Sequence, residues 1–285
     1  MKTVLYKEKA AECFFFLSAC ISIFAVALIC IFLFTNGLPA MKEIGFIDFL
    51  SGKKWKPGMD TFGIYPMILG SIYVTAGAII IGVPAGVLTA IFLTKFCPPR
   101  LCKIFKTIID LMAGVPSVVY GFWGMVVLVP FVKNTFGGNG NCILTASILL
   151  GIMILPTIIS VSEASLQAVP KTYYEGALAL GATKEQSVFF VVLPAAKSGI
   201  TAGIILGIGR AIGETMAVVM VAGNQARMPN GILRGIRTLT ANIVIEMGYA
   251  ADLHRGALIA TGVVLFIFIM VINLLFSILK SKRNI

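Results

Sequence analysis

Six long apolar segments, separated by shorter polar stretches, organise the chain. They cover residues 13–35, 67–93, 109–132, 142–162, 200–222 and 257–279. A helix of about 20 apolar residues can cross the roughly 30 Å of hydrocarbon in a bilayer. Proline interrupts the third segment at Pro116 and the fourth at Pro156, and bundles tolerate such breaks where neighbouring groups satisfy the backbone. The pattern predicts an all-α, polytopic membrane protein with about six transmembrane helices.

Charges at the two ends of the chain indicate how these helices are oriented. The basic residues that flank the first and last segments are Lys2, Lys7, Lys9, Lys280, Lys282 and Arg283. Such residues gather on the cytoplasmic side, and an even number of spans places both termini on one side. We therefore expect an N-in, C-in topology. The first apolar run is too long for a signal peptide, so it is expected to be a retained helix.

Composition narrows the possible functions. Hydrophobic residues make up 58% of the chain, charged residues make up 12%, and the mean hydropathy is +0.98. The net charge of +11 does not indicate nucleic-acid binding, because the basic residues are spread over both sides of the membrane. Anionic lipid headgroups would attract them. The six cysteines show no metal-ligand spacing, and the only histidine, His254, is expected to be a solvated loop residue.

Two charged residues stand four positions apart inside the fifth apolar segment. On a continuous helix, at about 100° per residue, Arg210 and Glu214 share one face with Gly203 and Gly207. A charge at the centre of a membrane helix costs at least roughly 2.5–3.5 kcal/mol on insertion scales, so it is expected to pair or to face a cavity. The two residues predict an anion pathway through the bundle. The alternative is a salt bridge that only stabilises the bundle.

Hydroxyl groups and possible helix breaks accompany these charges. The hydroxyl residues predicted at the same depth are Thr215, Ser117 and Tyr120. They would either donate to a substrate or bond between helices. The hinge candidates are Pro84, Gly114 and Pro116, because proline removes one helical hydrogen bond and blocks another. Static kinks are the alternative for these positions.

The longest inside segment, at about residues 163–199, has the pattern of two short helices. Gly181 stands at a C-cap position after the first helix. Thr183 and Gln186 have the spacing of a capping box for the second, and Pro194 then redirects the chain. By composition alone, an amphipathic hairpin lying on the membrane surface is an equally good interpretation.

Five residues of this segment also have a distinctive spacing: Glu175, Ala177, Gly181, Leu193 and Pro194. In this spacing the segment resembles the EAA loop of ABC importer permeases. It departs from that pattern at Gly176, which replaces alanine, and at Val191, which replaces isoleucine. The resemblance implies that the first short helix docks on a cytoplasmic ATPase subunit, with coupling residues Glu175, Ala177, Leu180, Gly181, Leu193 and Pro194.

Three further segments extend the resemblance over about residues 12–280. They cover residues 209–224, 113–124 and 55–66. All three resemble the permeases of bacterial high-affinity phosphate ABC importers, and the residues after Arg210 resemble the PstC-type subunit more than its PstA-type sister. The resemblance implies the type I ABC importer permease fold. An N-terminal transmembrane helix and extracytoplasmic loop would occupy residues 1–66, and the permease core residues 67–285.

The same resemblance implies a set of partners in the bacterial cytoplasmic membrane. They are a sister PstA-type permease, two cytoplasmic ATP-binding subunits, an extracytoplasmic phosphate-binding protein, membrane lipids and a phosphate-signalling regulator. The chain has no Gly-x-x-x-x-Gly-Lys-Ser/Thr phosphate-binding loop. We therefore expect no enzyme activity and no bound cofactor in this chain, with ATP and Mg²⁺ held by the partner ATPase.

The chemistry of Arg210 suits an oxyanion. Its guanidinium stays charged and presents a fork of donors to two oxygens. Glu214 would hold that fork in an empty site, or accept a hydrogen bond from a protonated phosphate. Outside the membrane, the charged residues that would face a binding protein, or simply be solvated, are Arg227, Arg234, Arg237 and Glu246.

Four other functions are compatible with these residues. The chain would be the PstA-type sister, or a permease for another oxyanion such as molybdate or sulfate. It would alternatively be a secondary transporter in which Glu214 carries a coupling proton beside Arg210. Such a carrier has no use for an ATPase-docking loop, which argues against it. The last alternative is a scaffold that reports phosphate status to a membrane kinase in addition to transport.

Overall fold

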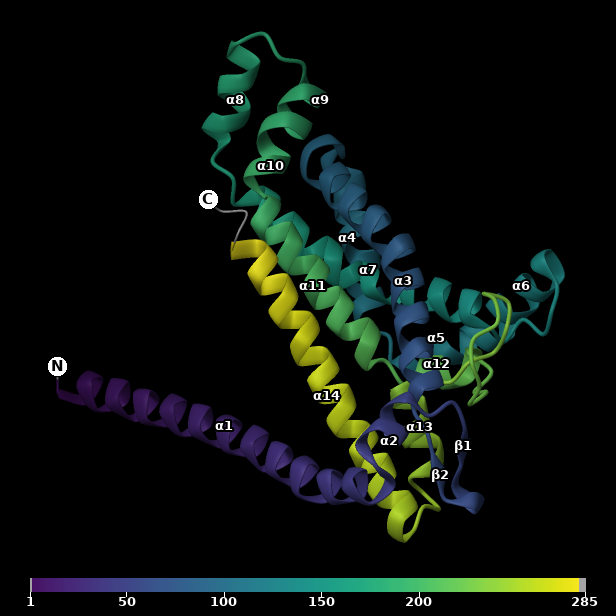
Figure 1. Ribbon diagram of the computed structural model, residues 1–285. Helices are drawn as coiled ribbons and strands as arrows, with labels where there is room; N and C mark the ends of the chain where they lie inside the picture. Colours follow the sequence, from purple (N-terminus) through teal and green to yellow (C-terminus); the bar gives the residue numbers. More distant parts are fainter. Residues whose placement is uncertain (1, 282–285) are drawn as a thin grey trace.

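The protein is almost entirely helical, as Figure 1 shows for a computed structural model that describes residues 2–281. The helices are α1 (Lys2–Ile44), α2 (Phe46–Ser51), α3 (Tyr65–Ile91), α4 (Pro99–Gly114), α5 (Ser117–Trp123), α6 (Val129–Phe136), α7 (Ile143–Gln167), α8 (Lys171–Ala179), α9 (Lys184–Ser187), α10 (Leu193–Ala195), α11 (Lys197–Gly213), α12 (Met216–Val221), α13 (Leu239–Glu246) and α14 (Asp252–Ser281). Smaller elements are β1 (Trp55–Lys56), β2 (Thr61–Phe62), a 3-10 turn at Pro57–Met59, and π-helical stretches at Phe92–Phe96, Gly124–Leu128 and Val188–Val192. The two strands form an antiparallel hairpin, with Trp55 opposite Phe62.

The apolar segments of the sequence become candidate membrane spans. Within residues 2–281, the stretches long and apolar enough on their own are Ala11–Ile44, Tyr65–Phe96, Ser117–Phe136, Ile143–Gln167 and Asp252–Leu275. A sixth results if Lys184–Ala195 and Lys197–Gly213, which are bent by 70° relative to each other, count as one span. The predicted all-α fold with about six transmembrane helices is confirmed, and α7 runs unbroken through Pro156.

Two of the predicted spans are broken helices. The third is interrupted at Val115 and Pro116, whose extended backbone separates α4 from α5. Proline explains this break, because it has no N–H for the helical ladder. The fifth segment, predicted as one helix over 200–222, instead ends at Gly213 and resumes at Met216. No proline lies at this second break, and the contacts of Glu214 described below stabilise it. The prediction of a continuous helix there is wrong.

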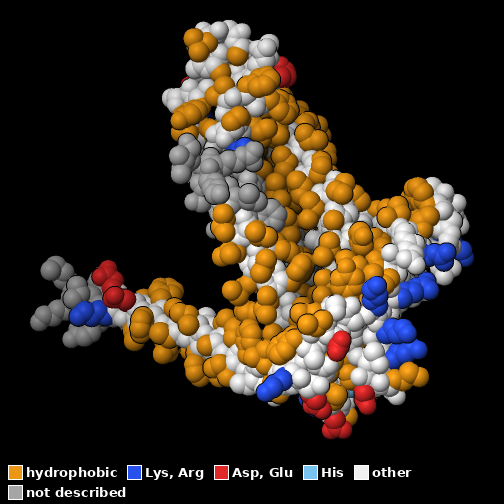
Figure 2. Space-filling model, viewed as in Figure 1, with side chains coloured by type: hydrophobic (Ala, Val, Ile, Leu, Met, Phe, Trp, Pro, Cys, Tyr) orange, Lys and Arg blue, Asp and Glu red, His pale blue; other side chains and the backbone are white. Residues whose placement is uncertain are grey.

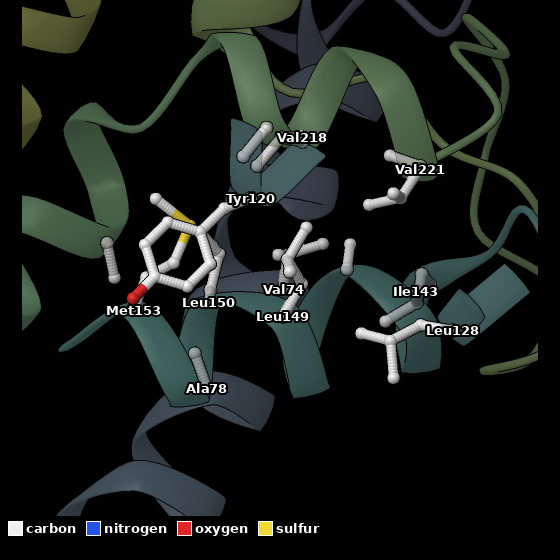
Figure 3. Packing of buried hydrophobic residues seen from close by; sticks show 14 of the residues in the cluster. Val74, Ala78, Tyr120, Leu128, Ile143, Leu149, Leu150, Met153, Val218 and Val221 are labelled. Atoms are coloured by element: carbon white, nitrogen blue, oxygen red, sulfur yellow. The ribbon is translucent and has the colours of Figure 1, made fainter. Parts of the chain in front are cut away.

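Helices α3 and α7 form the centre of the bundle. They pack side by side, and α11 packs against α7. The helices approach closely at glycines, since a methyl group on Gly82 would lie 2.8 Å from the carbonyl oxygen of Gly151. A buried apolar cluster on α3 and α7 extends to Tyr120 of α5 and Val218 of α12 (Figure 3). The short helices that follow the two breaks are thus held on the α3–α7 pair.

The two ends of the bundle carry different features (Figure 1). Helices α8 and α9 project from one end, close to the C-terminal end of α14, whereas α2, the β1–β2 hairpin and α13 gather at the other. The C-terminal part of α1 packs against α14 near Gly37. The N-terminal part extends away from the bundle, and residues 11–29 on it are exposed. Figure 2 shows hydrophobic side chains over α1 and the middle of the bundle. Lys282 and Arg283 of the basic tail lie outside the described residues.

Candidate functional site

Arg210 lies in the last turn of α11, immediately before the second helix break. Its side chain is half-buried, and its terminal nitrogen donates to the hydroxyl of Thr157 on α7 over 3.3 Å. Within residues 2–281 the ion pairs join Glu163 to Lys106, and Glu246 to Arg237 and His254. The Arg210 guanidinium is therefore held by a neutral hydroxyl, and no carboxylate cancels its charge.

Glu214 has a local role at the break. Its backbone is extended (φ −67°, ψ 130°), and its carboxylate accepts hydrogen bonds from the backbone N–H groups of Thr215 (3.2 Å) and Ala217 (3.3 Å). A carboxylate at this place satisfies donors that the first turn of α12 leaves free. The Glu214 carbonyl accepts a hydrogen bond from the Thr240 hydroxyl of α13 over 3.1 Å. The alternative interpretation, an Arg210–Glu214 salt bridge, does not form here, because the helix that would align the two residues ends between them.

The two broken helices meet at α5 and α12. An added methyl group on Gly121 of α5 would lie 2.9 Å from the Cα of Ala217 on α12, so the two helices are in close contact. Ser117 and Tyr120 of α5 and Thr215 at the start of α12 are thus carried by two helices that pack against each other. The structure brings together side chains from two breaks that lie about 100 residues apart along the chain.

Two of the predicted hydroxyl donors already have backbone acceptors. The Tyr120 hydroxyl is buried and donates to the carbonyl of Met112 over 2.9 Å, across the α4–α5 break. The Thr215 hydroxyl donates to the carbonyl of Gly213 over 3.1 Å. Each bond satisfies a carbonyl that a broken helix leaves without a helical partner. In this conformation, both residues stabilise the breaks and offer only oxygen lone pairs to a ligand.

The hinge candidates differ from one another in the structure. Gly114 ends α4, and Pro116 precedes α5, so these two residues form a true interruption. Pro84 instead lies inside the unbroken helix α3. A helix interruption leaves soft backbone torsions that can absorb a rotation, so a hinge role for Gly114 and Pro116 stays our prediction, whereas a kink is the simpler role of Pro84.

The predicted coupling loop has the local structure that its sequence indicates. Helix α8 ends in a Schellman motif: Gly181 has φ +90° and donates to the Leu178 carbonyl, and Ala182 donates to the Ala177 carbonyl. Thr183 and Gln186 form the predicted capping box of α9. These parts of the prediction are confirmed. They could be predicted from the sequence because each cap forms between residues at most five positions apart.

The coupling loop presents its tip to solvent and anchors its base on the bundle. Glu175 is exposed, and the apolar side chain of Leu180 is 92% exposed. At the base, Tyr174 and Leu193 pack against a buried cluster on the inner ends of α3 and α7, and Lys95 lies 5.6 Å from the centre of the Tyr174 ring. Pro194 lies in the short α10, just before the bend into α11. A partner bound at the exposed tip would therefore pull or push on α11 through α10.

Substitution of Gly181 by alanine is expected to destabilise the end of α8 by about 1–2 kcal/mol, since an L-residue pays that much in the left-handed conformation. Hydrogen exchange at the Gly181 and Ala182 positions should accelerate about 5- to 30-fold. Gly176→Ala is the matched control, because Gly176 lies inside α8 with no atom within 4 Å of an added methyl group. That control should slow exchange in α8. Equal exchange in both variants would contradict the Schellman argument.

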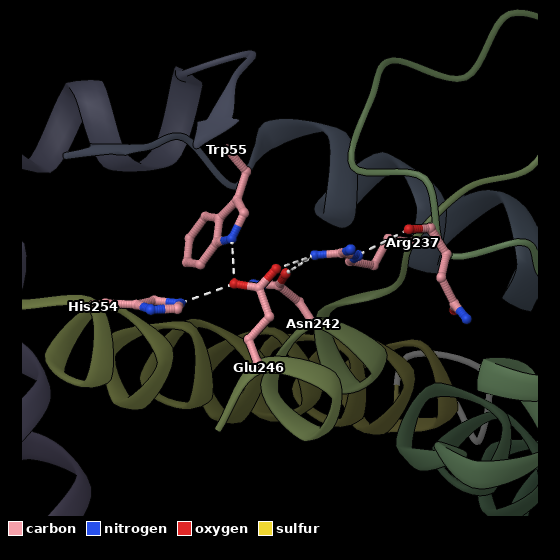
Figure 4. A network of polar contacts seen from close by, with 6 residues as sticks. Trp55, Arg237, Asn242, Glu246 and His254 are labelled. Carbon is pink, nitrogen blue, oxygen red and sulfur yellow. Dashed lines mark hydrogen bonds and ion pairs between the residues drawn. The ribbon is translucent and has the colours of Figure 1, made fainter. Parts of the chain in front are cut away.

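A buried polar network, which sequence reasoning missed, holds together the end of the bundle opposite α8 and α9, called the outer end from here on (Figure 4). The Glu246 carboxylate at the end of α13 is 5% exposed. It accepts from the Trp55 indole N–H over 2.7 Å, pairs with Arg237, and lies 2.8 Å from Nε2 of His254. His254 also packs against the rings of Trp55 and Phe62. Both the prediction that His254 is a solvated loop residue and the interpretation of Glu246 and Arg237 as a solvated face are wrong.

The network connects segments that are distant in sequence. Trp55 belongs to the β1–β2 hairpin, and it lies 191 positions from Glu246. Arg237 also donates to the Asn224 carbonyl over 3.1 Å and to the Asn242 side-chain oxygen over 3.0 Å. Nearby, burial and then the Glu246 charge raise the pKa of the Tyr249 hydroxyl, which stays protonated at neutral pH. The sequence pattern could not reveal the whole cluster, because Trp55 comes from the distant hairpin and His254 from α14.

Known proteins resemble the chain over most of its length. It is 38% identical over 274 residues to the probable ABC transporter permease protein YqgH of Bacillus subtilis (strain 168), covering 94% of this chain and 89% of the relative. It is 36% identical over 265 residues to the phosphate transport system permease protein PstC of Mesorhizobium japonicum, covering 86% of this chain and 81% of the relative. An archaeal relative, the probable phosphate transport system permease protein PstC of Methanocaldococcus jannaschii, is 33% identical over 267 residues, covering 86% of this chain and 84% of the relative.

Solved structures share the fold at lower identity. A chain in the crystal structure of a bacterial alginate ABC transporter superposes with a TM-score of 0.64 at 15% identity, covering 94% of this chain and 95% of the other. A chain of the inward-facing MetNI methionine ABC transporter gives 0.58 at 20% identity, covering 80% and 99%. The architecture is that of ABC importer permeases.

The family match covers the part of the chain that contains both helix breaks, the coupling loop and α14. Residues 82–284 match the family described as binding-protein-dependent transport system inner membrane component. Together with the relatives above 30% identity, this match identifies the chain as a multi-pass inner membrane subunit of the ABC importer type, and the chain belongs to the family of binding-protein-dependent transport system inner membrane components.

Proposed function

We propose that this chain is the PstC-type permease subunit of an ATP-driven phosphate importer. In this role it would pass inorganic phosphate from an extracytoplasmic binding protein through the membrane. Relatives with 33–36% identity over most of their length carry the name phosphate transport system permease protein PstC. These names favour the PstC-type over the PstA-type subunit, and phosphate over molybdate or sulfate.

The observation that carries the proposal is the unneutralised guanidinium of Arg210 at the junction of the two broken helices. A phosphate that leaves water needs a fixed cation and several hydrogen-bond donors in place of its hydration shell. Thr157, which contacts Arg210 over 3.3 Å, is easily exchanged for a phosphate oxygen, since a neutral hydroxyl binds a guanidinium less strongly than an anion does. A permanent partner carboxylate would have cancelled the attraction for phosphate.

The proposal extends to the partner subunits, and the exposed coupling loop supports an ATPase among them. Two cytoplasmic ATPase subunits would bind ATP and Mg²⁺, one of them docking on α8, and a PstA-type sister would complete the permease pair. The chain itself would bind no cofactor and catalyse no reaction. The segment between α7 and α11, with Glu175 and Leu180 exposed at its tip, favours ATP-driven transport over a secondary transporter with Glu214 as proton carrier. In addition, the Glu214 carboxylate accepts hydrogen bonds from two backbone N–H groups, which favours its charged form over a proton-carrying one.

The test is ATP-driven uptake of labelled phosphate by proteoliposomes that contain the chain, its sister permease, the ATPase subunits and the binding protein. Arg210→Gln should lower the initial uptake rate at least about tenfold, because each hydrogen bond to a charged group contributes about 1.5–3 kcal/mol. Assembly and basal ATPase activity should be retained. Arg255→Gln, at an exposed position in the first turn of α14, is the matched control and should leave uptake unchanged.

The same experiment separates the alternatives. Uptake that persists in Arg210→Gln would make Arg210 a packing residue, and the phosphate assignment would lose its physical support. Uptake that continues without ATP would favour a secondary transporter. Uptake of labelled sulfate or molybdate in place of phosphate would keep the permease assignment and change the substrate.

A further inference from the structure

A polar cavity lies at the outer end of the protein, away from Arg210. It is formed by the loop between α6 and α7 and the segment between α12 and α13, and its volume is about 310 Å³. Hydrogen bonds fix the two segments to each other: Ile143 donates to the Arg234 carbonyl over 3.2 Å, and Leu144 donates to the Ile232 carbonyl over 3.0 Å. The cavity is thus a built feature of the fold, with walls from two ordered segments.

The charge around this cavity is positive. Arg227 and Arg234 both line it, and its lining contains no aspartate or glutamate. Neither arginine takes part in the ion pairs formed within residues 2–281. Lys133, in the last turn of α6, stands next to Gly140 at the edge of the same loop. Figure 2 shows Lys and Arg side chains gathered at this corner of the molecule, where α6 and the segment after α12 lie in Figure 1.

Two side-chain amides add donors to the cavity. Asn141 and Gln225 line it, and the amide oxygen of each is buried without a hydrogen-bond partner in the described part of the chain. The NH₂ group of each amide makes no hydrogen bond within the described residues and is not buried. The NH₂ groups are therefore the accessible polar ends of these two side chains. Two guanidinium groups and two NH₂ groups with no acceptor therefore surround one space.

Such a set of groups suits a multiply charged oxyanion. Guanidinium groups bind the oxygens of phosphate-like anions in pairs, and a concave site lined by one sign of charge raises the local concentration of the opposite ion. The volume exceeds that of a bare tetrahedral anion, which leaves room for some of its hydration water. An apolar ligand would gain little here, because the walls are polar.

We propose that this cavity is a second oxyanion-binding site, at the extracytoplasmic mouth of the permease, that takes inorganic phosphate or a chemically similar tetrahedral anion before it reaches Arg210. The choice of phosphate rests on the proposed function, whereas the oxyanion class rests on the cavity itself. The site would raise the phosphate concentration near the mouth when the binding protein releases its ligand.

The test uses the full importer complex in lipid nanodiscs, without the binding protein, in equilibrium dialysis against labelled inorganic phosphate at low salt. The double variant Arg227→Gln, Arg234→Gln should weaken the outer phosphate-binding phase at least about tenfold. Arg210→Gln should leave that phase intact, and Arg255→Gln should match the unmodified complex. Unchanged binding in the double variant would overturn the proposal.

Two further outcomes separate this site from its rivals and from the proposed function. Labelled sulfate or molybdate that binds with the same dependence on Arg227 and Arg234, while phosphate does not bind, supports the oxyanion site and contradicts the phosphate function. Stimulation of ATPase activity by the binding protein is measured in parallel. If the double variant loses only that stimulation and keeps its anion binding, the cavity is a docking surface for an acidic protein and the proposal fails.

Discussion

Replacement of Glu246 by alanine is expected to cost about 3–5 kcal/mol of folding free energy, the effect of removing one partner from a buried ion pair. The substitution leaves the Arg237 guanidinium, 14% exposed at its side chain, without its carboxylate. It also leaves the Trp55 indole N–H without its 2.7 Å acceptor. The β1–β2 hairpin, α13 and the first turn of α14 would then lose a carboxylate that is bonded to all three.

The measurement is thermal unfolding of the detergent-solubilised protein, followed by size-exclusion chromatography of the remaining folded fraction. Glu246→Gln should have an intermediate effect, because its amide oxygen can still accept one hydrogen bond but carries no charge for Arg237. Glu43→Ala, at an exposed acidic position near the end of α1, should change stability by less than about 0.5 kcal/mol. A Glu246→Ala protein as stable as this control would show that the network is not a structural connection.

Replacement of Leu180 by aspartate is expected to weaken the binding of the ATPase subunits while the fold is retained. The Leu180 side chain is 92% exposed and sits at the C-terminal end of α8, so the fold does not depend on it. An apolar anchor buried at the centre of an interface typically accounts for about 2–4 kcal/mol of binding, which is about 30- to 700-fold in affinity. The permease should therefore bind the ATPase subunits much more weakly, and ATP-driven uptake should fall with it.

Binding of purified ATPase subunits to the permease in nanodiscs gives the direct measurement for Leu180→Asp. The control is Ile232→Asp, which makes the same chemical change at a 61% exposed isoleucine in the outer segment after α12. Its effect on ATPase binding should be negligible, because the proposed ATPase contact on α8 lies at the opposite end of the bundle. Equal binding by both variants would remove Leu180 from the coupling contact and would leave α8 without its apolar anchor.

The two findings at Arg210 and Glu214 show where sequence reasoning reached its limit. The glycine and charge spacing predicted that both residues belong to one region of the bundle. It assumed one continuous helix, however, and so allowed an ion pair that the structure does not form. The break depends on the Glu214 carboxylate capping α12 and on Thr240, which donates to the Glu214 carbonyl from 26 positions away. A helical pattern cannot reveal this competition between a regular helix and a distant donor.

The outer end shows the same limit more strongly. Charged residues in a loop are usually solvated, and this expectation placed His254, Glu246 and Arg237 on a surface. Glu246 is instead buried, because its carboxylate is bonded to the side chains of Trp55, Arg237 and His254. A buried charge needs such partners, and the partners come together only when the hairpin, α13 and α14 have packed.

The sequence by itself determined that the chain has about six apolar helical spans, because about 20 consecutive apolar residues have no stable alternative to a helix in hydrocarbon. It also determined the caps of the coupling loop at Gly181 and Thr183, since those bonds form between residues at most five positions apart. Only the tertiary structure decided the partner of Arg210, the break at Glu214, the network around Glu246 and the positive outer cavity. Each of these depends on hydrogen bonds or close approach between distant segments, and their geometry exists only after the helices have packed.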